Sequence, residues 1–200
     1  FNMWYNDEHL SDLVAIPGVL NAARYEAVSG SPKYLAAYEL TNPEVRDTPE
    51  YQEHLIKPSE WSNRVNLQGI ATRLIQNNYR QIYPTEVSAE VAGSDMAPVL
   101  QIGRMTIPED LEDEWNTFYN STYAPNYATV PGCIRFRRYA LYKGHGPKYS
   151  VVYEFENENV SQTPEWFAAR EKSGGSLGDL YPRMSHDDGS PGVYKKVFQL

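Results

Sequence analysis

The chain has 200 residues, of which 41% are hydrophobic and 22% charged, a composition typical of a folded globular protein. Its 26 acidic and 18 basic residues give a formal net charge of -8, which argues against nucleic acid or an anionic membrane surface as a partner. The single cysteine, Cys133, excludes an internal disulfide and favours a cytoplasmic location. No apolar run is long enough to span a membrane, so we predict no membrane partner.

The first predicted element is an amphipathic helix over residues 2–16. Leu10 and Leu13 fall on one arc of a helical wheel, and Asp7 falls on the opposite side. The pair Pro17-Gly18 is a helix stop signal. We therefore expect this helix to cover a sheet with its apolar arc.

Two strands and further helices follow in the sequence. Residues 19–28 and 33–40 are strand-like runs joined by a short turn-forming segment, which predicts an antiparallel hairpin. A helix is predicted to begin after Thr48, which suits a capping position. The remaining predicted elements of this part are a helix at residues 59–76 and a strand at residues 78–87.

The order of these elements then repeats. A shift of 114 residues, and of 115 after one inserted residue, superposes identical or similar residues along most of the chain. The matched segments include Trp4-Tyr5-Asn6 with Phe118-Tyr119-Asn120, Arg24-Tyr25 with Arg138-Tyr139, and Tyr38-Glu39 with Tyr153-Glu154. The second copy has a further strand at residues 99–107 ahead of its helix, so its pattern is βαββαβ. We expect the corresponding strand of the first copy to precede residue 1.

A family resemblance rests on these repeated stretches. The segment FNMWYNDEHLSDLVAIPGVLNAARY resembles the helix and second strand of EthD-like members of the dimeric α+β barrel superfamily, and WNTFYNSTYAPNYATVPGCIRFRRY is similar but more diverged. The resemblance implies an α+β fold in which two ferredoxin-like repeats form a barrel within one chain. The predicted units are a first repeat at residues 1–87, which lacks its first strand, a linker at residues 88–97, and a second repeat at residues 98–200.

The resemblance does not fix the reaction, because relatives include cofactor-free monooxygenases, polyketide cyclases, lactone isomerases and heme enzymes. The family pattern has a proline after its His-Leu pair. Here Ser11 stands in that place, while the second copy has Pro125. The second copy also has Tyr123 where the first has His9, so we expect the two halves to differ in chemistry.

His9 is the strongest catalytic candidate. It falls near the apolar arc of its helix, so its imidazole is expected to point toward the sheet, where it can act as a general acid or base. Asp12 lies one helical turn away and is the candidate for orienting the ring. Tyr123 is the catalytic candidate at the matching place of the second copy. The alternative for His9 is a core histidine that donates to a backbone carbonyl.

Candidate substrate contacts are aromatic residues and one arginine. Neighbouring strand residues such as Arg24 and Tyr25 point to opposite faces, so only one of them can line a given pocket. A phenol or guanidinium on the pocket face suits an enolate or phenolate oxygen. The alternative is packing common to both copies. The predicted substrate-contacting residues are Trp4, Arg24, Tyr25, Tyr38, Phe118 and Tyr139.

No metal or cofactor is predicted. His186-Asp187-Asp188 lies in a long loop at residues 174–192, where adjacent residues seldom converge on one ion, and His54 is expected on an exposed helix. Heme-binding relatives place their axial histidine in the second half, where this chain has Tyr123. The sequence also has no glycine-rich phosphate loop.

These observations predict a cofactor-independent enzyme that isomerises, cyclises or eliminates an oxygenated, apolar substrate, aromatic or polyketide-like, with His9 as general acid or base. A cofactor-free monooxygenase is the first alternative, and oxygen consumption distinguishes it. A metabolite-binding or accessory module without catalysis is the second. The expected partner is a small-molecule substrate, and association of two chains into a homodimer stays open.

Overall fold

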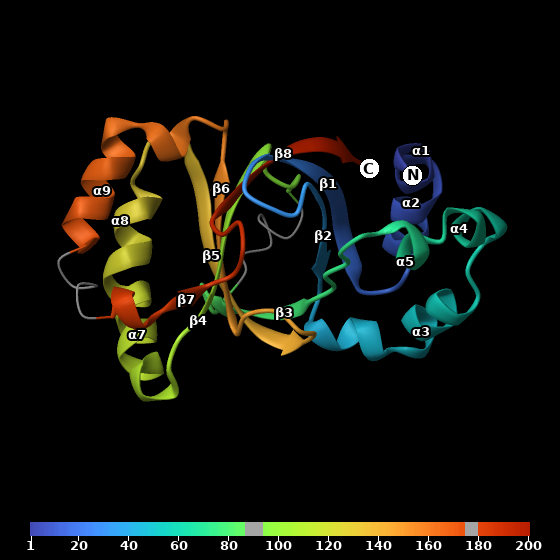
Figure 1. Cartoon of the computed structure of the whole chain (residues 1–200), viewed down its shortest axis with the longest axis horizontal. Coiled ribbons are helices and arrows are strands. Elements are labelled where there is room, and N and C mark those ends of the chain that lie inside the picture. The colour runs from blue at the N-terminus through green and yellow to red at the C-terminus, as the bar shows by residue number, and fades with distance from the viewer. Residues whose placement is uncertain (87–93, 175–179) are drawn as a thin grey trace.

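The computed structural model describes residues 1–86, 94–174 and 180–200 and has an α+β architecture with one curled antiparallel sheet. Figure 1 shows helices on two opposite sides of the central strands. Along the sheet the strand order is β2-β1-β8-β4-β6-β5-β3, and β7 pairs with β4 off this path. The strands are β1 (Val19–Ser29), β2 (Tyr34–Leu40), β3 (Asn78–Tyr83), β4 (Val99–Thr106), β5 (Cys133–Lys143), β6 (Tyr149–Phe155), β7 (Ser185–His186) and β8 (Gly192–Gln199).

We call β1 to β3 with their helices the first half, and β4 to β8 with theirs the second half. The helices of the first half are α1 (Asn2–Trp4), η1 (Tyr5–His9), α2 (Leu10–Val14), η2 (Pro43–Asp47), α3 (Pro49–Ile56), α4 (Glu60–Val65) and α5 (Leu67–Ile70). Those of the second half are η3 (Glu109–Leu111), α7 (Glu112–Phe118), η4 (Tyr119–Tyr123), α8 (Ala124–Ala128), η5 (Val160–Gln162), α9 (Pro164–Gly174) and η6 (Tyr181–Arg183). No helix within the described ranges has the length and apolarity needed to cross a membrane.

The predicted first helix contains a π-helical turn. Segments α1, η1 and α2 follow one another without interruption, and the backbone N–H of Leu10 donates to the carbonyl of Tyr5, a five-residue step. The second half has the same feature, with Ala124 N donating to the Tyr119 carbonyl in η4. A π turn changes the angular phase of the helix, so a wheel drawn for a regular α-helix misplaces residues beyond it.

Local signals located most elements of the first half. Both predicted hairpin strands form, and Thr48 caps α3 by accepting a hydrogen bond from the Tyr51 N–H. The single helix expected at residues 59–76 was wrong. The structure has two short helices, α4 and α5, because Asn66 between them adopts a left-handed backbone conformation with φ of 45°. Most of the linker predicted at residues 88–97 lies outside the described residues.

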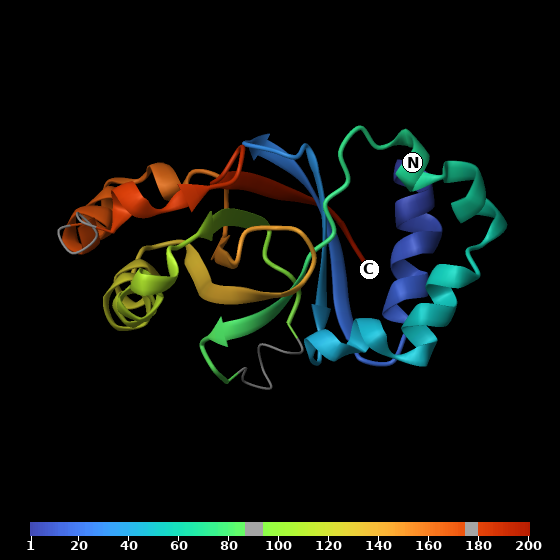
Figure 2. The same ribbon diagram turned by 60° about the horizontal axis from the view of Figure 1, so that its bottom comes forward.

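Two strand pairings join the halves, and they match. Strand β1 pairs with β8, with Ala27 opposite Tyr194, and β5 pairs with β3, with Leu141 opposite Tyr79. These pairs are related by the same shifts of 114 and 115 residues found in the sequence. The strands curl around the middle of the molecule (Figure 2), so each half presents one sheet face to its helices and the other to the barrel interior.

Candidate functional site

Arg24 on β1 ties the first helix to the sheet. Its guanidinium donates to the side-chain oxygens of Asn6 at 2.7 Å and Asn2 at 2.6 Å, and it lies 4.7 Å from the centre of the Tyr5 ring. The arginine is only 5% exposed. Because a buried charge is costly unless its donors are satisfied, this set of partners is needed for the fold itself.

Arg138 repeats the arrangement in the second half. It donates to Asn120 at 2.5 Å and to Asn116 at 2.7 Å, and it lies 4.4 Å from the Trp115 ring centre. Burial lowers the pKa of Arg138 to about 10. One arginine and two asparagines recur at both sites, which supports the alternative that these arginines serve packing common to both copies.

A hollow of about 170 Å³ borders Arg24 at the start of the first helix. Its lining residues are Asn2, Asn6, Arg24, Glu26, Tyr34 and Val197. At the matching position Arg138 is more deeply buried, at 1% exposed, and its Nε is enclosed without a hydrogen-bond partner. Of the two arginines, Arg24 is therefore the one with a neighbouring space for a small molecule.

His9 lies about one turn further along the same helix and is half-buried. Its imidazole stacks on Trp4 with ring centres 4.3 Å apart, meets the Tyr5 ring edge-on at 5.0 Å, and lies 6.1 Å from the His54 ring. The ring contacts are thus with its own helix and with α3, whereas the wheel placed the side chain toward the sheet. The π turn that ends at His9 accounts for this rotation.

The surroundings of His9 keep its ring neutral. Burial, and then the nearby His54, lower the pKa of His9 to about 4, while Glu8 opposes them. Glu8 is engaged in turn, accepting hydrogen bonds from Ser59 and from Ser62. His54 was predicted to be exposed and is instead half-buried against His9, because α3 packs beside the first helix.

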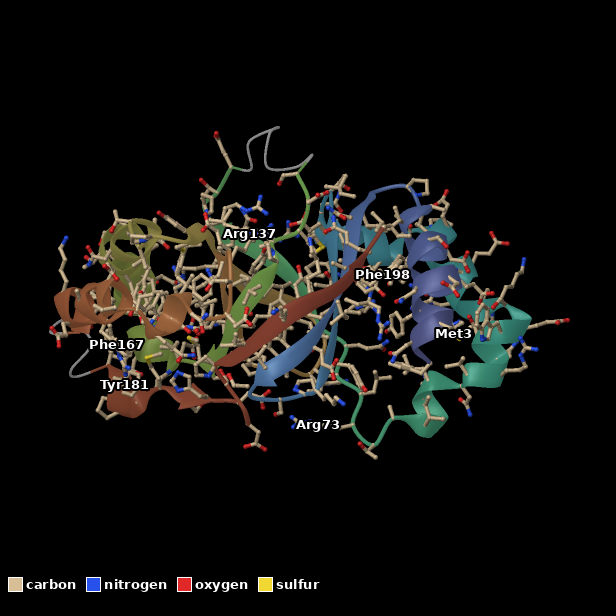
Figure 3. The ribbon with its side chains drawn as sticks, turned by 90° about the horizontal axis from the view of Figure 1, so that it is seen from above. Met3, Arg73, Arg137, Phe167, Tyr181 and Phe198 are labelled. Atoms are coloured by element: carbon tan, nitrogen blue, oxygen red, sulfur yellow. The ribbon has the colours of Figure 1, made fainter. Side chains whose placement is uncertain are left out.

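Trp4 forms one wall of this cluster and is almost fully buried. Its indole N–H donates to Ser62 Oγ of α4 at 3.0 Å, which fixes the plane on which the imidazole stacks. Phe198 near the end of β8 packs against the same apolar cluster, beside the first helix (Figure 3). Asp12 makes no hydrogen bond or ion pair with His9 among the described contacts, so the predicted orienting pair does not form here.

Tyr38 on β2 adds a buried hydroxyl near Tyr5. Its Oη has no hydrogen-bond partner of good geometry, although it lies near enough to the Tyr5 hydroxyl to influence its pKa. Burial raises the pKa of Tyr38, so the phenol stays protonated. An unsatisfied buried donor of this kind is costly and suits an oxygen acceptor on a ligand.

The second half has aromatic rings where the first has this cluster. Tyr123 takes the place of His9 and stacks on Tyr119 at 4.5 Å, with Tyr127 at 4.6 Å and Phe118 at 6.0 Å. Burial raises the pKa of Tyr119 and Tyr127, so these phenols are neutral. The structure thus separates Tyr123 and Phe118 from the other candidates and surrounds them with packed rings.

Tyr25 and Tyr139 lie on the opposite face of the sheet from Arg24 and His9. The Tyr25 hydroxyl donates to the Ala97 carbonyl at 2.9 Å, and burial raises the pKa of Tyr139 to about 12. The prediction that one residue of each Arg-Tyr pair faces a given pocket agrees with this alternation. Both tyrosines are therefore remote from the His9 cluster.

The barrel interior holds an ion network that the sequence analysis missed. Arg137, labelled in Figure 3, forms ion pairs with Glu39 of the first half at 2.7 Å and with Glu154 at 2.6 Å. The Nε–H of Arg137 does not point at the Glu154 oxygen, so this contact is an ion pair without a hydrogen bond. Arg135 also lies 2.6 Å from Glu154. In the sequence, the occurrence of Glu39 and Glu154 at matching positions of the two copies could have indicated this network. A charged residue repeated in a strand indicates a shared buried role.

The residues of the His186-Asp187-Asp188 run have other partners in the structure. Asp187 is held by Arg104 at 3.2 Å, and His186 packs on Tyr181 with ring centres 5.8 Å apart. Within the described part of the chain, no three His, Cys, Asp or Glu side chains gather as ligands. A second hollow of about 250 Å³ lies near Arg73 and His145, away from the His9 cluster.

Comparison with known proteins gives the fold. No protein-family model matches the chain, and no curated protein matches its sequence. A proposed chlorite dismutase of known structure matches with a TM-score of 0.61 at 14% identity, over 98% of this chain and 82% of that one. The chain shares the dimeric α+β barrel fold.

Two further structures match over nearly the whole chain. A proposed monooxygenase from Lactobacillus acidophilus has a TM-score of 0.56 at 11% identity, covering 98% of this chain and 86% of that one. An anthrone oxidase-like protein has a TM-score of 0.55 at 13% identity, covering 94% and 81%. At these identities the likeness concerns the fold, so the reaction has to be argued from the residues.

Proposed function

We propose that the protein is a cofactor-independent enzyme that removes a proton from an oxygenated, largely apolar aromatic substrate, with His9 as the base. The observation that carries this proposal is that a neutral imidazole, His9, and a protonated phenol, Tyr38, both lie next to Tyr5. Trp4 supplies a flat apolar wall. At the matching place the second half has Tyr123, a phenol without a base.

The low pKa of His9 limits the kind of substrate that it can deprotonate. With a pKa of about 4, His9 is a weak base in the free protein, so it suits a substrate with an acidic C–H next to aromatic rings or a carbonyl. The substrate anion formed beside the ring favours the protonated imidazole and raises its pKa as the proton moves. Tyr38 is the donor suited to the oxygen on which the negative charge develops.

Oxygenation is the outcome that the structural neighbours favour, because proteins of similar fold include proposed monooxygenases and an anthrone oxidase-like protein. The substrate methylene gives a proton to His9, and the resulting carbanion passes one electron to dioxygen. The two radicals combine to a peroxide anion, which recovers the proton and loses water to leave a carbonyl. In sum, a methylene and dioxygen give a carbonyl and water.

Isomerisation, cyclisation or elimination is the second candidate. It is supported by the acid–base pair itself, since His9 can take a proton from one atom while Tyr38 donates to another. The EthD-like assignment, which rests on the repeated helix and strand segments, is compatible with either reaction. In both cases a small apolar molecule is the proposed partner.

The test uses an anthrone as the substrate, because its central methylene is acidic. We expect the protein to consume oxygen and form the corresponding quinone, and His9→Gln to lower the rate roughly 100-fold or more. His54→Gln and Tyr123→Phe are the matched controls, and we expect them to keep most of the activity. Oxygen uptake and product mass are measured together.

Anaerobic deuterium exchange separates the alternatives. Exchange at the substrate carbon that depends on His9, without oxygen uptake in air, favours the proton-transfer reactions over oxygenation. A protein that binds the compound but shows neither exchange nor oxygen uptake is a binding module for it. Full activity of His9→Gln contradicts the proposed role of the imidazole.

A further inference from the structure

The sheet path ends at β2 and at β3, both in the first half. Strand β2 pairs with β1 alone, and β3 pairs with β5 alone, among the described strands. Their counterparts in the second half have neighbours on both sides. Strand β6 lies between β5 and β4, and β8 lies between β1 and β4. Thus β4 joins β6 to β8, while no described strand joins β2 to β3.

The strand with two neighbours, β6, is also more buried than its counterpart β2, which has one. Six of the seven residues of β6 are buried, whereas β2, which has the related sequence YLAAYEL, has none. Since both strands have a hairpin partner and a helical layer, the neighbour supplied by β4 is the element that distinguishes them. An edge strand of this length without a partner is unusual in a protein unless something covers it.

The backbone groups of β2 that face the gap can be identified. The N–H of Ala27 donates to the Lys33 carbonyl, so in an antiparallel ladder every second residue from Lys33 bonds to β1 and the residues between them face away. The outward-facing residues are Tyr34, Ala36, Tyr38 and Leu40. Their counterparts, Tyr149, Val151, Tyr153 and Phe155, lie opposite Met105, Gly103, Gln101 and Val99 of β4.

We propose that the gap between β2 and β3 is the seat of one further strand, supplied by the same polypeptide directly ahead of helix α1. The strand runs antiparallel to both neighbours, as β4 does to β6 and β8. In the second half only residues 107–111 separate β4 from α7, so a short connection suffices. Because Arg24 holds Asn2 as Arg138 holds Asn116, the start of α1 has the matching position over the sheet.

A second copy of the chain is a poorer occupant. Pairing between two exposed β2 edges satisfies one side of each strand and leaves β3 open, whereas a single inserted strand satisfies both edges. A connection to α1 also makes the pairing intramolecular, which avoids the entropy cost of association.

The inserted strand also completes the candidate site. In the second half, Val99 and Met105 of β4 face the helices and join the core around Trp115, while Leu100 faces the barrel interior. The corresponding positions of an inserted strand form the floor of the first-half cluster next to Tyr38. This inference rests on the sheet topology and stands apart from the proposed reaction.

An extended protein tests the proposal. A second copy of residues 99–114, which comprise β4 and the chain that leads from it to Trp115, the counterpart of Phe1, is joined ahead of Phe1. We expect the melting temperature to rise by roughly 5 °C or more. We also expect amide hydrogen exchange at Ala36 and Tyr38 to slow by roughly 100-fold. The control carries the same extension with the copies of Gln101 and Gly103 changed to proline, which cannot pair, and it should show neither effect.

A second extension, with the copy of Met105 changed to valine, allows for a bulky side chain that does not fit the first half. If both extensions leave the exchange of Ala36 and Tyr38 unchanged, the proposal is wrong. It is equally overturned if the unextended protein is a dimer by light scattering in which these two amides are already protected. Activity toward an anthrone is not part of this readout, so the two proposals fail independently.

Discussion

Trp115 of the second half is fully buried, whereas Phe1, which occupies the matching position in the first half, is 40% exposed. Strand β6 is buried along its length and β2 is not. The same arginine and asparagine contacts hold both helices to the sheet, so the two halves share a frame but differ in how completely it is packed. The difference indicates that, among the described residues, the second half supplies more of the stability than the first.

Truncating the matched aromatic residues should show the largest contrast. Trp115→Ala removes a buried ring that also contacts Arg138, and we expect the free energy of unfolding to fall by about 4 kcal/mol. Phe1→Ala removes a half-exposed ring and should cost less than about 1 kcal/mol. Urea unfolding measures both, and equal losses contradict the proposed division of stability.

Removing charge from the matched glutamates should give the next contrast. Glu154 is fully buried between Arg135 and Arg137, so Glu154→Gln removes the one carboxylate charge that both guanidiniums face and should cost about 3 kcal/mol. Glu39 is partly exposed, and Arg137 is its ion-pair partner within the described part of the chain, so Glu39→Gln should cost about 1 kcal/mol. If Glu39→Gln is the more damaging in urea unfolding, the network is centred on the first half instead.

The fold could be predicted from the sequence because its signals are local or repeated. Strand alternation, the Thr48 cap and the shift of 114 to 115 residues each depend on residue type and spacing alone. The matching pairings of β1 with β8 and β5 with β3 follow the same shifts. The break at Asn66 was not predictable in this way, because asparagine adopts the left-handed conformation only in some contexts.

The site was predicted less well, because side-chain direction depends on backbone details that the sequence does not show. The π turn rotates His9 toward α3, and only the packing of α3 brings His54 beside it. Arg24, Tyr25 and Tyr139 all stayed candidates, because strand alternation shows that only one residue of an Arg-Tyr pair faces a given pocket but not which one. The ion network of Arg137 required knowledge of which strands face each other across the barrel.

His9 should give its helix a pH dependence that Tyr123 does not give the matching helix of the second half. Folding lowers the pKa of His9 from 6.5 to about 4, so the folded state favours the neutral ring. This contribution is fully present above pH 6.5 and is lost as the pH falls toward 4, by roughly 2 to 3 kcal/mol in total. His9→Tyr copies the residue at position 123, and the difference between wild type and variant should shrink by that amount toward pH 4.

Urea unfolding of both proteins between pH 4 and pH 8 measures this difference. Carboxylates and histidines remote from His9 also titrate in this range, but they are common to the two proteins and cancel in the subtraction. A difference that does not change with pH contradicts the proposed burial of a neutral imidazole at this position.

Cys133 should show the smallest effect, because it matches an apolar residue, Val19, at the start of the corresponding strand. Burial, aided by Glu154, raises the pKa of its thiol to about 11, so at neutral pH the group is a small neutral side chain. Cys133→Val should therefore change the free energy of unfolding by less than about 1 kcal/mol. The native thiol should also react with iodoacetamide roughly 100-fold more slowly than a free cysteine, since the thiolate is the reactive form. Rapid alkylation of the folded protein would show that this position is more open than Val19, and the matching of the two strands would fail at their first residue.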